Sequence, residues 1–145
     1  MRLQLTRRAD YAIRVALCLG REQGDARLAA SEIARRMDVP PRFLPQVMQD
    51  LVGARLVEAS LGRSGGYRLT RPPGDISLLE VIEAVEGDAR RRTCVLSAGD
   101  CDASRPCDVH GLFARAQDAL LEELRGASIH DALATSLARS SIGTG

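Results

Sequence analysis

The chain has 145 residues, of which 45% are apolar, 27% are charged and 3% are aromatic. This length fits one domain, or one small domain with an appended dimerisation element. With so few aromatic residues the core must be mainly aliphatic, which favours helices over an aromatic-rich β-sandwich. The sequence contains neither a signal-peptide pattern nor about 18 uninterrupted apolar residues, so we expect a cytoplasmic protein that does not contact membranes.

The net charge of +1 hides a difference between the two halves of the chain. Residues 1–72 carry 13 Arg against 7 acidic residues, a net charge of +6, whereas residues 73–145 carry 7 Arg against 12 acidic residues, a net charge of −5. A basic region of this kind is typical of a surface that meets phosphate. Random surface charge is the alternative for this feature taken alone.

The first half predicts three helices and a hairpin. Apolar residues recur with helical spacing over residues 6–19, and residues 31–37 follow as a short helix that Ser31 caps. A third helix begins near Arg42, because Pro45 fits only in its first turn. Two strand-like runs come next, joined by a Gly-rich segment that predicts a hairpin with a mobile tip; they are residues 57–61 and 67–69.

The second half predicts two further long elements around an irregular loop. Ser77 and Glu80 have the spacing of a capping box, which opens a helix that a glycine ends. Residues 88–108 have no periodicity, and so long a loop in a compact domain is usually functional. A long helix resumes near Val109, and residues 129–139 form a short terminal helix.

The order of helix, short helix, turn, helix and hairpin is that of a winged helix-turn-helix. The second helix of such a motif enters the major groove of DNA and exposes its polar side to the bases. Gln can bridge N6 and N7 of adenine, and Arg can pair with guanine or grip phosphate, whereas an Arg on the hairpin can also be merely solvated. We predict DNA contacts from five residues: Arg42, Gln46, Gln49, Arg63 and Arg68.

Three cysteines in the irregular loop are the most informative chemistry of the chain. Cys94, Cys101 and Cys107 are separated by six and five residues, so flexible spacers allow the three thiolates to converge on one metal centre. Structural zinc usually uses a Cys-x2-Cys pair, which is missing here, so zinc is disfavoured. In a reducing compartment clustered cysteines indicate metal or redox chemistry rather than disulfides. Cys18, by contrast, lies in an apolar helical stripe, and we predict that it is buried.

Several segments carry a resemblance to a known family: Leu5-Thr6, Asp10-Tyr11-Ala12-Ile13-Arg14, Arg42-Phe43-Leu44-Pro45-Gln46, Gly65-Gly66-Tyr67-Arg68-Leu69 and the cysteine triplet. They resemble the winged-helix regulators that include IscR, NsrR and RirA (the Rrf2 family), over the chain up to about residue 135. The resemblance implies a homodimer that pairs through the long helix, a roughly palindromic DNA operator and an iron–sulfur cluster on the triplet. Gln46 matches a base-reading Gln of IscR. Leu61 stands where the IscR wing has Arg, so that contact is lost or moved to Arg63.

The resemblance leaves two candidates for the fourth ligand of the cluster. His110 follows Cys107 at i+3, similar to the Cys-x2-His of IscR, which carries a 2Fe-2S cluster. Asp10 sits where NsrR-type regulators supply a carboxylate, across the dimer, to a 4Fe-4S cluster; it also has the spacing of an ordinary helical ion pair with Arg14. We favour His110 and a 2Fe-2S cluster, because His110 is one of only two His and adjoins the triplet.

We therefore predict a repressor whose DNA binding answers to a cluster that senses redox state, iron or nitric oxide. The alternative is the same fold acting as a metal-free thiol–disulfide redox sensor. We do not expect an enzyme, because the sequence lacks a catalytic triad pattern and a phosphate-binding Gly loop. The expected fold is mainly α with a small β-hairpin, in three parts: a winged helix-turn-helix DNA-binding domain (1–74), a helix, Cys-rich loop and dimerisation helix (75–139), and a flexible tail (140–145).

Overall fold

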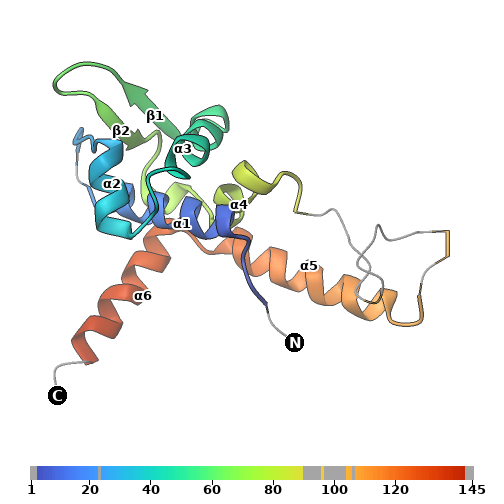
Figure 1. Ribbon diagram of the computed structural model, residues 1–145. Coiled ribbons are helices and arrows are strands. Elements are labelled where there is room, and N and C mark those ends of the chain that lie inside the picture. Colours follow the sequence, from blue (N-terminus) through green and yellow to red (C-terminus); the bar gives the residue numbers. More distant parts are fainter. Residues whose placement is uncertain (1–2, 23, 90–95, 97–103, 106, 143–145) are drawn as a thin grey trace.

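The structure is a computed structural model that describes residues 3–22, 24–89, 96, 104–105 and 107–142, of which residues 137–142 are described by their backbone alone. Its described residues form a helical body with one antiparallel hairpin, from which α5 and α6 project in different directions (Figure 1). This arrangement confirms the predicted mainly α fold with a small hairpin. The elements are α1 (Arg7–Gly20), α2 (Ala30–Met37), α3 (Leu44–Gly53), β1 (Val57–Ser60), β2 (Gly66–Leu69), the short 3-10 helix Pro73–Asp75, α4 (Leu78–Glu86), α5 (His110–Gly126) and α6 (Ile129–Ile142).

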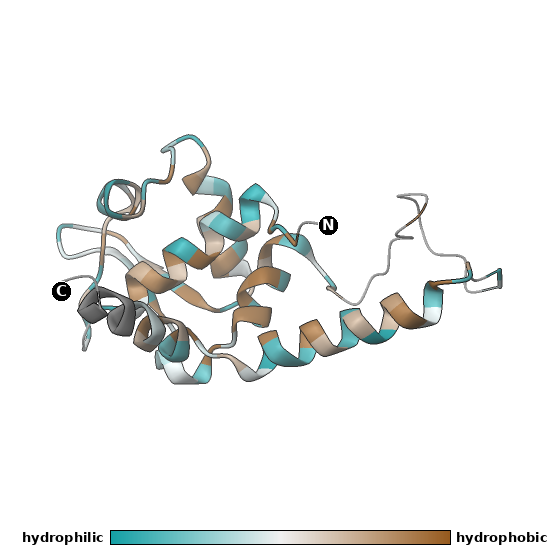
Figure 2. Cartoon of the chain, turned by 90° about the horizontal axis from the view of Figure 1, so that it is seen from below, coloured by the Kyte–Doolittle hydropathy of each residue, from teal (hydrophilic) through white to brown (hydrophobic). Residues whose placement is uncertain are grey.

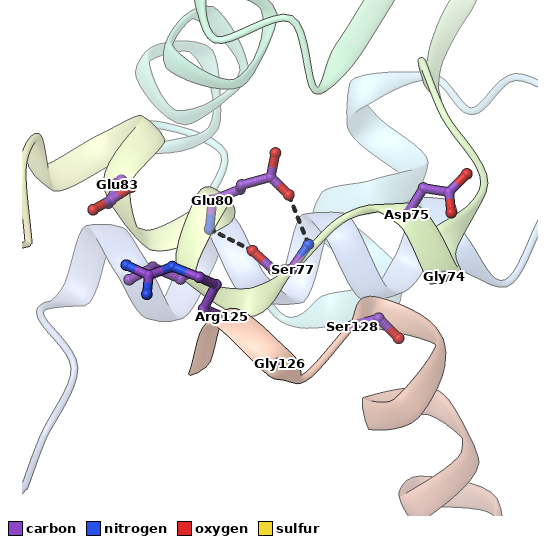
Figure 3. A pocket seen from close by; sticks show the side chains of 9 residues that line it. Gly74, Asp75, Ser77, Glu80, Glu83, Arg125, Gly126 and Ser128 are labelled. Atoms are coloured by element: carbon purple, nitrogen blue, oxygen red, sulfur yellow. Dashed lines mark hydrogen bonds between the residues drawn. The ribbon is translucent and has the colours of Figure 1, made fainter. Parts of the chain in front are cut away.

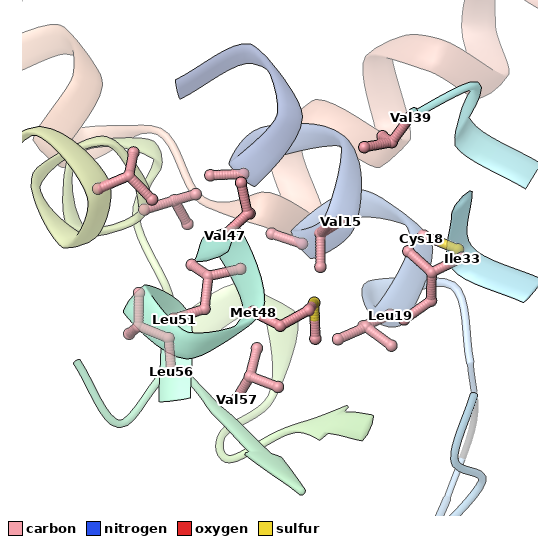
Figure 4. Close-up of a cluster of buried hydrophobic side chains, with 14 of the residues drawn as sticks. Val15, Cys18, Leu19, Ile33, Val39, Val47, Met48, Leu51, Leu56 and Val57 are labelled. Atoms are coloured by element: carbon pink, nitrogen blue, oxygen red, sulfur yellow. The ribbon is translucent and has the colours of Figure 1, made fainter. Parts of the chain in front are cut away.

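Helix α1 lies at the centre of the body and packs chiefly against α4, and also against α2, α3 and α6. Thr6 caps its start by accepting a hydrogen bond from the backbone N–H of Ala9. The buried face consists mostly of small side chains, which allows neighbouring helices to approach closely: Ala9, Ala12, Val15, Ala16, Cys18 and Leu19. Figure 4 shows this face meeting Val47, Met48 and Leu51 of α3. The prediction that Cys18 belongs to the core is confirmed, and burial raises the pKa of its thiol.

The short helix α2 begins at Ala30, so the prediction that Ser31 caps it is wrong. The local preference is overridden by the two residues before the helix, Leu28 and Ala29. Leu28 forms an isolated antiparallel bridge with Tyr67 of the hairpin, with backbone N–H to oxygen distances of 3.0 and 2.8 Å. This bridge holds the chain extended up to Ala29, which becomes the cap position although it has no side chain that can cap. Ser31 therefore falls inside the first turn.

Helix α3 begins at Leu44, two residues later than predicted, with Pro45 in its first turn as expected. The backbone N–H of Phe43 donates to the carbonyl of Pro40 at 3.0 Å, which closes a turn over residues 41–43. Arg42 therefore lies in this turn rather than in the helix. The turn orients α3 across α1, as the helix-turn-helix arrangement requires.

Strands β1 and β2 form the wing, in which Val57 pairs with Leu69 and Ser60 with Gly66. Leu61 was expected to end the first strand, but the strand stops at Ser60 and Leu61 lies outside it. Gly66 has a φ of +134°, and a Cβ there would lie 2.6 Å from the carbonyl oxygen of Leu28. Only glycine fits this close approach, through which the wing is attached to the segment before α2.

The predicted capping box of α4 is confirmed: Ser77 accepts from the N–H of Glu80, and Glu80 accepts from the N–H of Ser77. Helix α5 begins one residue after Val109, and α6 continues to Ile142, past the predicted end at residue 139. None of the described helices combines the length and the apolar character needed to cross a membrane.

Replacing Gly20 with Ala tests the packing of α6 on α1. A Cβ at Gly20 would lie 2.9 Å from Cγ2 of Ile129 and 3.2 Å from Cδ1 of Leu133. Because Ile129 is fully buried, it cannot move aside without cost. Gly53 is the matched control, since it also ends a helix but a Cβ there meets nothing within 4 Å. In urea denaturation we expect Gly20→Ala to be less stable than Gly53→Ala by about 1–3 kcal/mol. Equal stabilities would contradict this packing.

Candidate nucleic-acid interface and cysteine loop

The outer face of α3 presents the two glutamines that the sequence singled out. Gln46 and Gln49 are both exposed and lie one turn apart, so they share a face of the helix. The opposite face holds α3 against the body through fully buried side chains: Leu44, Val47, Met48 and Leu51. Helix α3 thus turns an amide-bearing face to solvent on a rigid support.

Arg42 lies beside the start of this face. Its guanidinium stacks over the ring of Phe43, 4.8 Å from the ring centroid, and Arg7 of α1 lies over the same ring at 6.0 Å. Tyr11 packs against Phe43 with its ring centroid 5.5 Å away. Phe43 therefore connects α1 to the turn and gathers two cations at the start of α3. Such cation–π contacts leave the guanidinium N–H groups able to donate to phosphate or base edges.

Sequence analysis missed two residues near Gln46: Asp50, which contacts it, and Arg8, which contacts Asp50. Asp50 of α3 accepts a hydrogen bond from Gln46 Nε2 at 3.1 Å, and its other carboxylate oxygen pairs with Arg8 of α1. The spacing of Gln46 and Asp50 along one helix was a readable signal. The contact with Arg8 was not, because it joins residues far apart in sequence that only the packing of α1 on α3 brings together.

The wing separates its two predicted DNA-binding arginines. Arg63 is exposed at the tip, next to Leu61, which is 98% exposed, and forms no ion pair with any described residue. Arg68 instead pairs with Glu58 and, at 2.6 Å, with Asp25. These hydrogen bonds, first that with Glu58, raise the pKa of Arg68. Arg68 thus ties the wing to the segment between α1 and α2, and its predicted contact with DNA would have to compete with two carboxylates.

Only part of the predicted cluster site lies within the described residues. Cys107 is a half-buried free thiol, and the backbone N–H of His110 donates to its carbonyl oxygen at 3.0 Å. Cys107 therefore lies just before α5, in a turn that this hydrogen bond closes, and His110 is the first residue of the helix. Cys94 and Cys101 lie outside the described residues. Among the described residues no group of three or more possible metal ligands is found.

Asp10, the alternative fourth ligand, has both carboxylate oxygens engaged. Arg14 donates to them through Nε at 2.9 Å and Nη2 at 3.1 Å, and the hydrogen bond with Asp10 raises the pKa of Arg14. The remaining nitrogen, Nη1, donates to the carbonyl of Met37 at the end of α2. This arrangement gives Asp10 a structural role, because Arg14 links it to the end of α2, and a metal bound at Asp10 would have to share its carboxylate with Arg14.

The two ends of the cysteine loop meet the same helix. At its start, the carbonyl of Ala89 accepts from Gln117 of α5, while its N–H donates to Glu83 of α4. At its end, Cys107 leads directly into α5 at His110. His110 and Gln117 are seven residues apart, about 10 Å along a helix axis. The two described ends of the loop are thus held at points about two turns apart on the same helix.

The start of the loop is also connected to α1. Glu86, the last residue of α4, accepts a hydrogen bond from the side chain of Thr6, which caps α1. Arg8, which contacts Asp50 on α3, follows two residues later. Short contacts therefore run from the loop through the start of α1 to the exposed face of α3.

Most of α5 lies away from the body, and only its Leu121 is buried. The hydropathy colouring in Figure 2 shows apolar residues along this projecting helix. Several of them share one face and are exposed: Leu112 (61%), Phe113 (39%) and Leu120 (41%), with Ala116 between them. An apolar face of this size on a projecting helix is typical of a surface that another chain covers.

A polar hollow lies between α4 and the connection from α5 to α6. Its lining includes Asp75, Glu80, Glu83 and Arg125 (Figure 3). Glu80 is committed to the capping box and to Arg71, from which it accepts at 2.9 Å. Glu83 is committed to the N–H of Ala89. The carboxylates of the hollow thus serve the helix start and the loop.

Comparison with known proteins adds relatives whose sequences align over most of the chain. Protein aau3 of Rhizobium meliloti is 34% identical over 131 residues, which cover 89% of this chain and 84% of the relative. An rrf2-like HTH-type transcriptional regulator of Rhodobacter capsulatus is 30% identical over 138 residues, covering 90% and 92%. The regulator NsrR of Geobacillus kaustophilus is 26% identical, covering 90% of both chains.

Solved structures share the fold. CymR, described as the global cysteine regulator of B. subtilis, superposes with a TM-score of 0.77 at 24% identity, covering 92% of this chain and 98% of CymR. T. potens IscR superposes with a TM-score of 0.73 at 21% identity, covering 92% and 88%. The Rrf2 family, described as iron-dependent transcriptional regulators, matches residues 5–135. The chain with its central α1, exposed α3 and wing is thus a member of the Rrf2 family of transcriptional regulators.

Proposed function

We propose that this chain is a repressor that binds a roughly palindromic double-stranded operator as a homodimer, under the control of an iron–sulfur cluster. The observation that carries the DNA-binding part is the exposed face of α3, where Gln46 and Gln49 lie beside Arg42. In the major groove, Gln reads adenine through its amide, and Arg reads guanine or holds phosphate. Arg63 at the wing tip extends the contact to the backbone or minor groove, and Arg68 supports the wing from which Arg63 projects.

The proposed dimer forms through the apolar face of α5. Burying exposed Leu and Phe side chains against a second copy gains about 25 cal/mol per Å² removed from water. A two-fold axis between paired α5 helices gives two recognition helices related by the same symmetry, and such a pair reads a palindrome.

The proposed cluster is held by Cys94, Cys101, Cys107 and His110. The described half of this donor set fits, because Cys107 is a free thiol and a backbone hydrogen bond joins it to His110 at the start of α5. His110 is preferred over Asp10, since both oxygens of Asp10 are occupied by Arg14. A bound 2Fe-2S cluster supplies one-electron redox chemistry, and a His ligand raises its potential relative to an all-cysteine site; a 4Fe-4S cluster with Asp10 is the other form.

The contacts around the cysteine loop support control of DNA binding from that loop. Ala89 at its start is held by α4 and α5, and Glu86 joins the end of α4 to Thr6. Ordering the loop fixes where α4 and α5 lie relative to each other, and hence the spacing of the two α3 helices on the operator. The state of the loop would thus reach the DNA-binding face through the relative positions of the helices.

The second candidate is a metal-free thiol–disulfide sensor with the same fold. It is favoured by one observation, that Cys107 is a free and only half-buried thiol, and so is accessible to oxidants. The iron and sulfide content of the purified protein distinguishes the two candidates.

Replacing Arg63 with Ala tests the wing contact. Each phosphate contact that is lost lowers the slope of log K against log salt concentration by about 0.9. We expect Arg63→Ala to weaken binding to duplex DNA and to lower this slope by about that amount, measured by fluorescence anisotropy at several salt concentrations. Arg115→Ala, an exposed arginine on α5, removes the same charge and should leave the slope unchanged. Equal slopes for both variants would argue against the wing contact.

Replacing Phe113 with Arg tests the dimer. A charge within the apolar face opposes its burial, so we expect light scattering to report the 15.6 kDa monomer for Phe113→Arg and twice that mass for the wild type. Glu122→Arg is the matched control, because residue 122 is about two and a half turns further along and therefore lies on the opposite side of the same helix. A wild-type monomer, or a dimer that survives Phe113→Arg, would contradict this interface.

Anaerobic purification with iron and sulfide analysis tests the cluster. We expect a coloured protein with about two irons per chain. The Cys107→Ser and His110→Ala variants should lose this iron or show an altered spectrum, whereas Asp10→Ala should keep the iron content and the spectrum of the wild type. Cys18→Ala is the matched control, because Cys18 is a core residue. About four irons with dependence on Asp10 would support the 4Fe-4S form. A colourless protein that iron and sulfide cannot reconstitute would contradict the cluster hypothesis and favour the metal-free thiol sensor.

A further inference from the structure

The side chain that is predicted to read a base is itself held by a neighbour. Gln46 projects from the exposed face of α3, and its Nε2 donates to Asp50 Oδ1 at 3.1 Å, one turn further along the helix. The other oxygen of Asp50 pairs with Arg8 of α1. We propose that Asp50 is a positioning residue that sets the orientation of the Gln46 amide for base reading, and that Arg8 locks Asp50 in place.

The orientation follows from hydrogen-bond chemistry. A carboxylate has no N–H or O–H to donate, so it accepts only, and the amide must turn its NH₂ group rather than its oxygen toward Asp50. Without such a partner a Gln side chain samples both amide orientations, because the oxygen and the NH₂ group have nearly the same shape. Asp50 thereby selects one of two states that present opposite patterns to DNA.

The selected state keeps the atoms that adenine requires. One hydrogen of Nε2 is used by Asp50, while the second hydrogen and the oxygen Oε1 face solvent at an exposed position. Bidentate reading of adenine needs one N–H for N7 and one oxygen for the N6 amino group. In the flipped amide the oxygen would face N7, which is an acceptor, and the NH₂ group would face the N6 amino group, which is a donor, so neither hydrogen bond would form.

Arg8 of α1 adds a second contact to the pair that Gln46 and Asp50 form along α3. The side chain of Asp50 is 19% exposed and that of Arg8 is 52% exposed, so the carboxylate lies at the edge of the interface between α1 and α3. An unpaired carboxylate next to the DNA backbone would repel phosphate. Arg8 neutralises this charge and fixes the carboxylate from a second helix, so that the amide is held against a support independent of α3.

This inference rests on the proposed DNA binding, and selection from random duplexes followed by sequencing tests both. The same pool of random duplexes is presented to four full-length proteins: the wild type, Gln46→Ala, Asp50→Ala and Asp50→Glu. Gln46→Ala identifies the operator position that Gln46 reads. At that position we expect Asp50→Ala to lose most of the base preference, which for a bidentate pair is roughly 5- to 150-fold. We expect Asp50→Glu, which restores an acceptor, to keep much of that preference.

The remaining readouts separate positioning from a structural role. Preference at other operator positions should stay, and affinity for non-specific duplex should stay or rise because a negative charge is removed. Glu32→Ala, which removes an ion-paired carboxylate from α2, should alter no base preference. A preference that is unchanged in Asp50→Ala, or that falls equally at all positions, would overturn the positioning role alone. A wild-type chain that selects no sequence would overturn the proposed DNA reading together with it.

Discussion

The rest of the structure depends on the close packing of α1 against its neighbours. Its buried face consists of three alanines, a cysteine, a valine and a leucine, and these mostly small side chains allow α3, α4 and α6 all to approach one helix. The approach at Gly20 is so close that even a methyl group there would be too near Ile129. As a result α1 becomes the element through which the DNA-facing helix, the helix before the cysteine loop and the C-terminal helix are positioned relative to one another.

The charges of the first half are used in two ways. Several arginines neutralise carboxylates within the fold: Arg35 and Arg36 hydrogen-bond Glu32 and lower its pKa to about 2, and Arg68 holds the wing to its base. Arg42 and Arg63 pair with no carboxylate among the described residues, and they lie at the start of α3 and at the wing tip. Arg42 and Arg63 are therefore left for phosphate on either side of the glutamines.

The same contacts tie the two proposed activities together. Thr6 and Arg8 lie two residues apart at the start of α1, and one binds the end of α4 while the other binds Asp50 on α3. A displacement of the cysteine loop that moves the end of α4 thus acts on the helix end that also supports the recognition face. This connection consists of two surface contacts at the start of α1, so the proposed coupling does not depend on a long pathway through the core.

The sequence by itself determined the elements and their order, because hydrophobic periodicity, Pro45, the Ser77 capping box and the glycine-rich hairpin are local signals. It also singled out Gln46, Gln49 and the pair Cys107 and His110 from residue type and spacing. It misplaced the cap of α2, where a long-range bridge to the wing overrode a local preference. The pair of Asp10 and Arg14 was also readable from its i+4 spacing. Only the tertiary structure decided that Arg68 pairs with Asp25, that Arg14 also reaches Met37, and that Arg8 supports Asp50, because these contacts join residues distant in sequence.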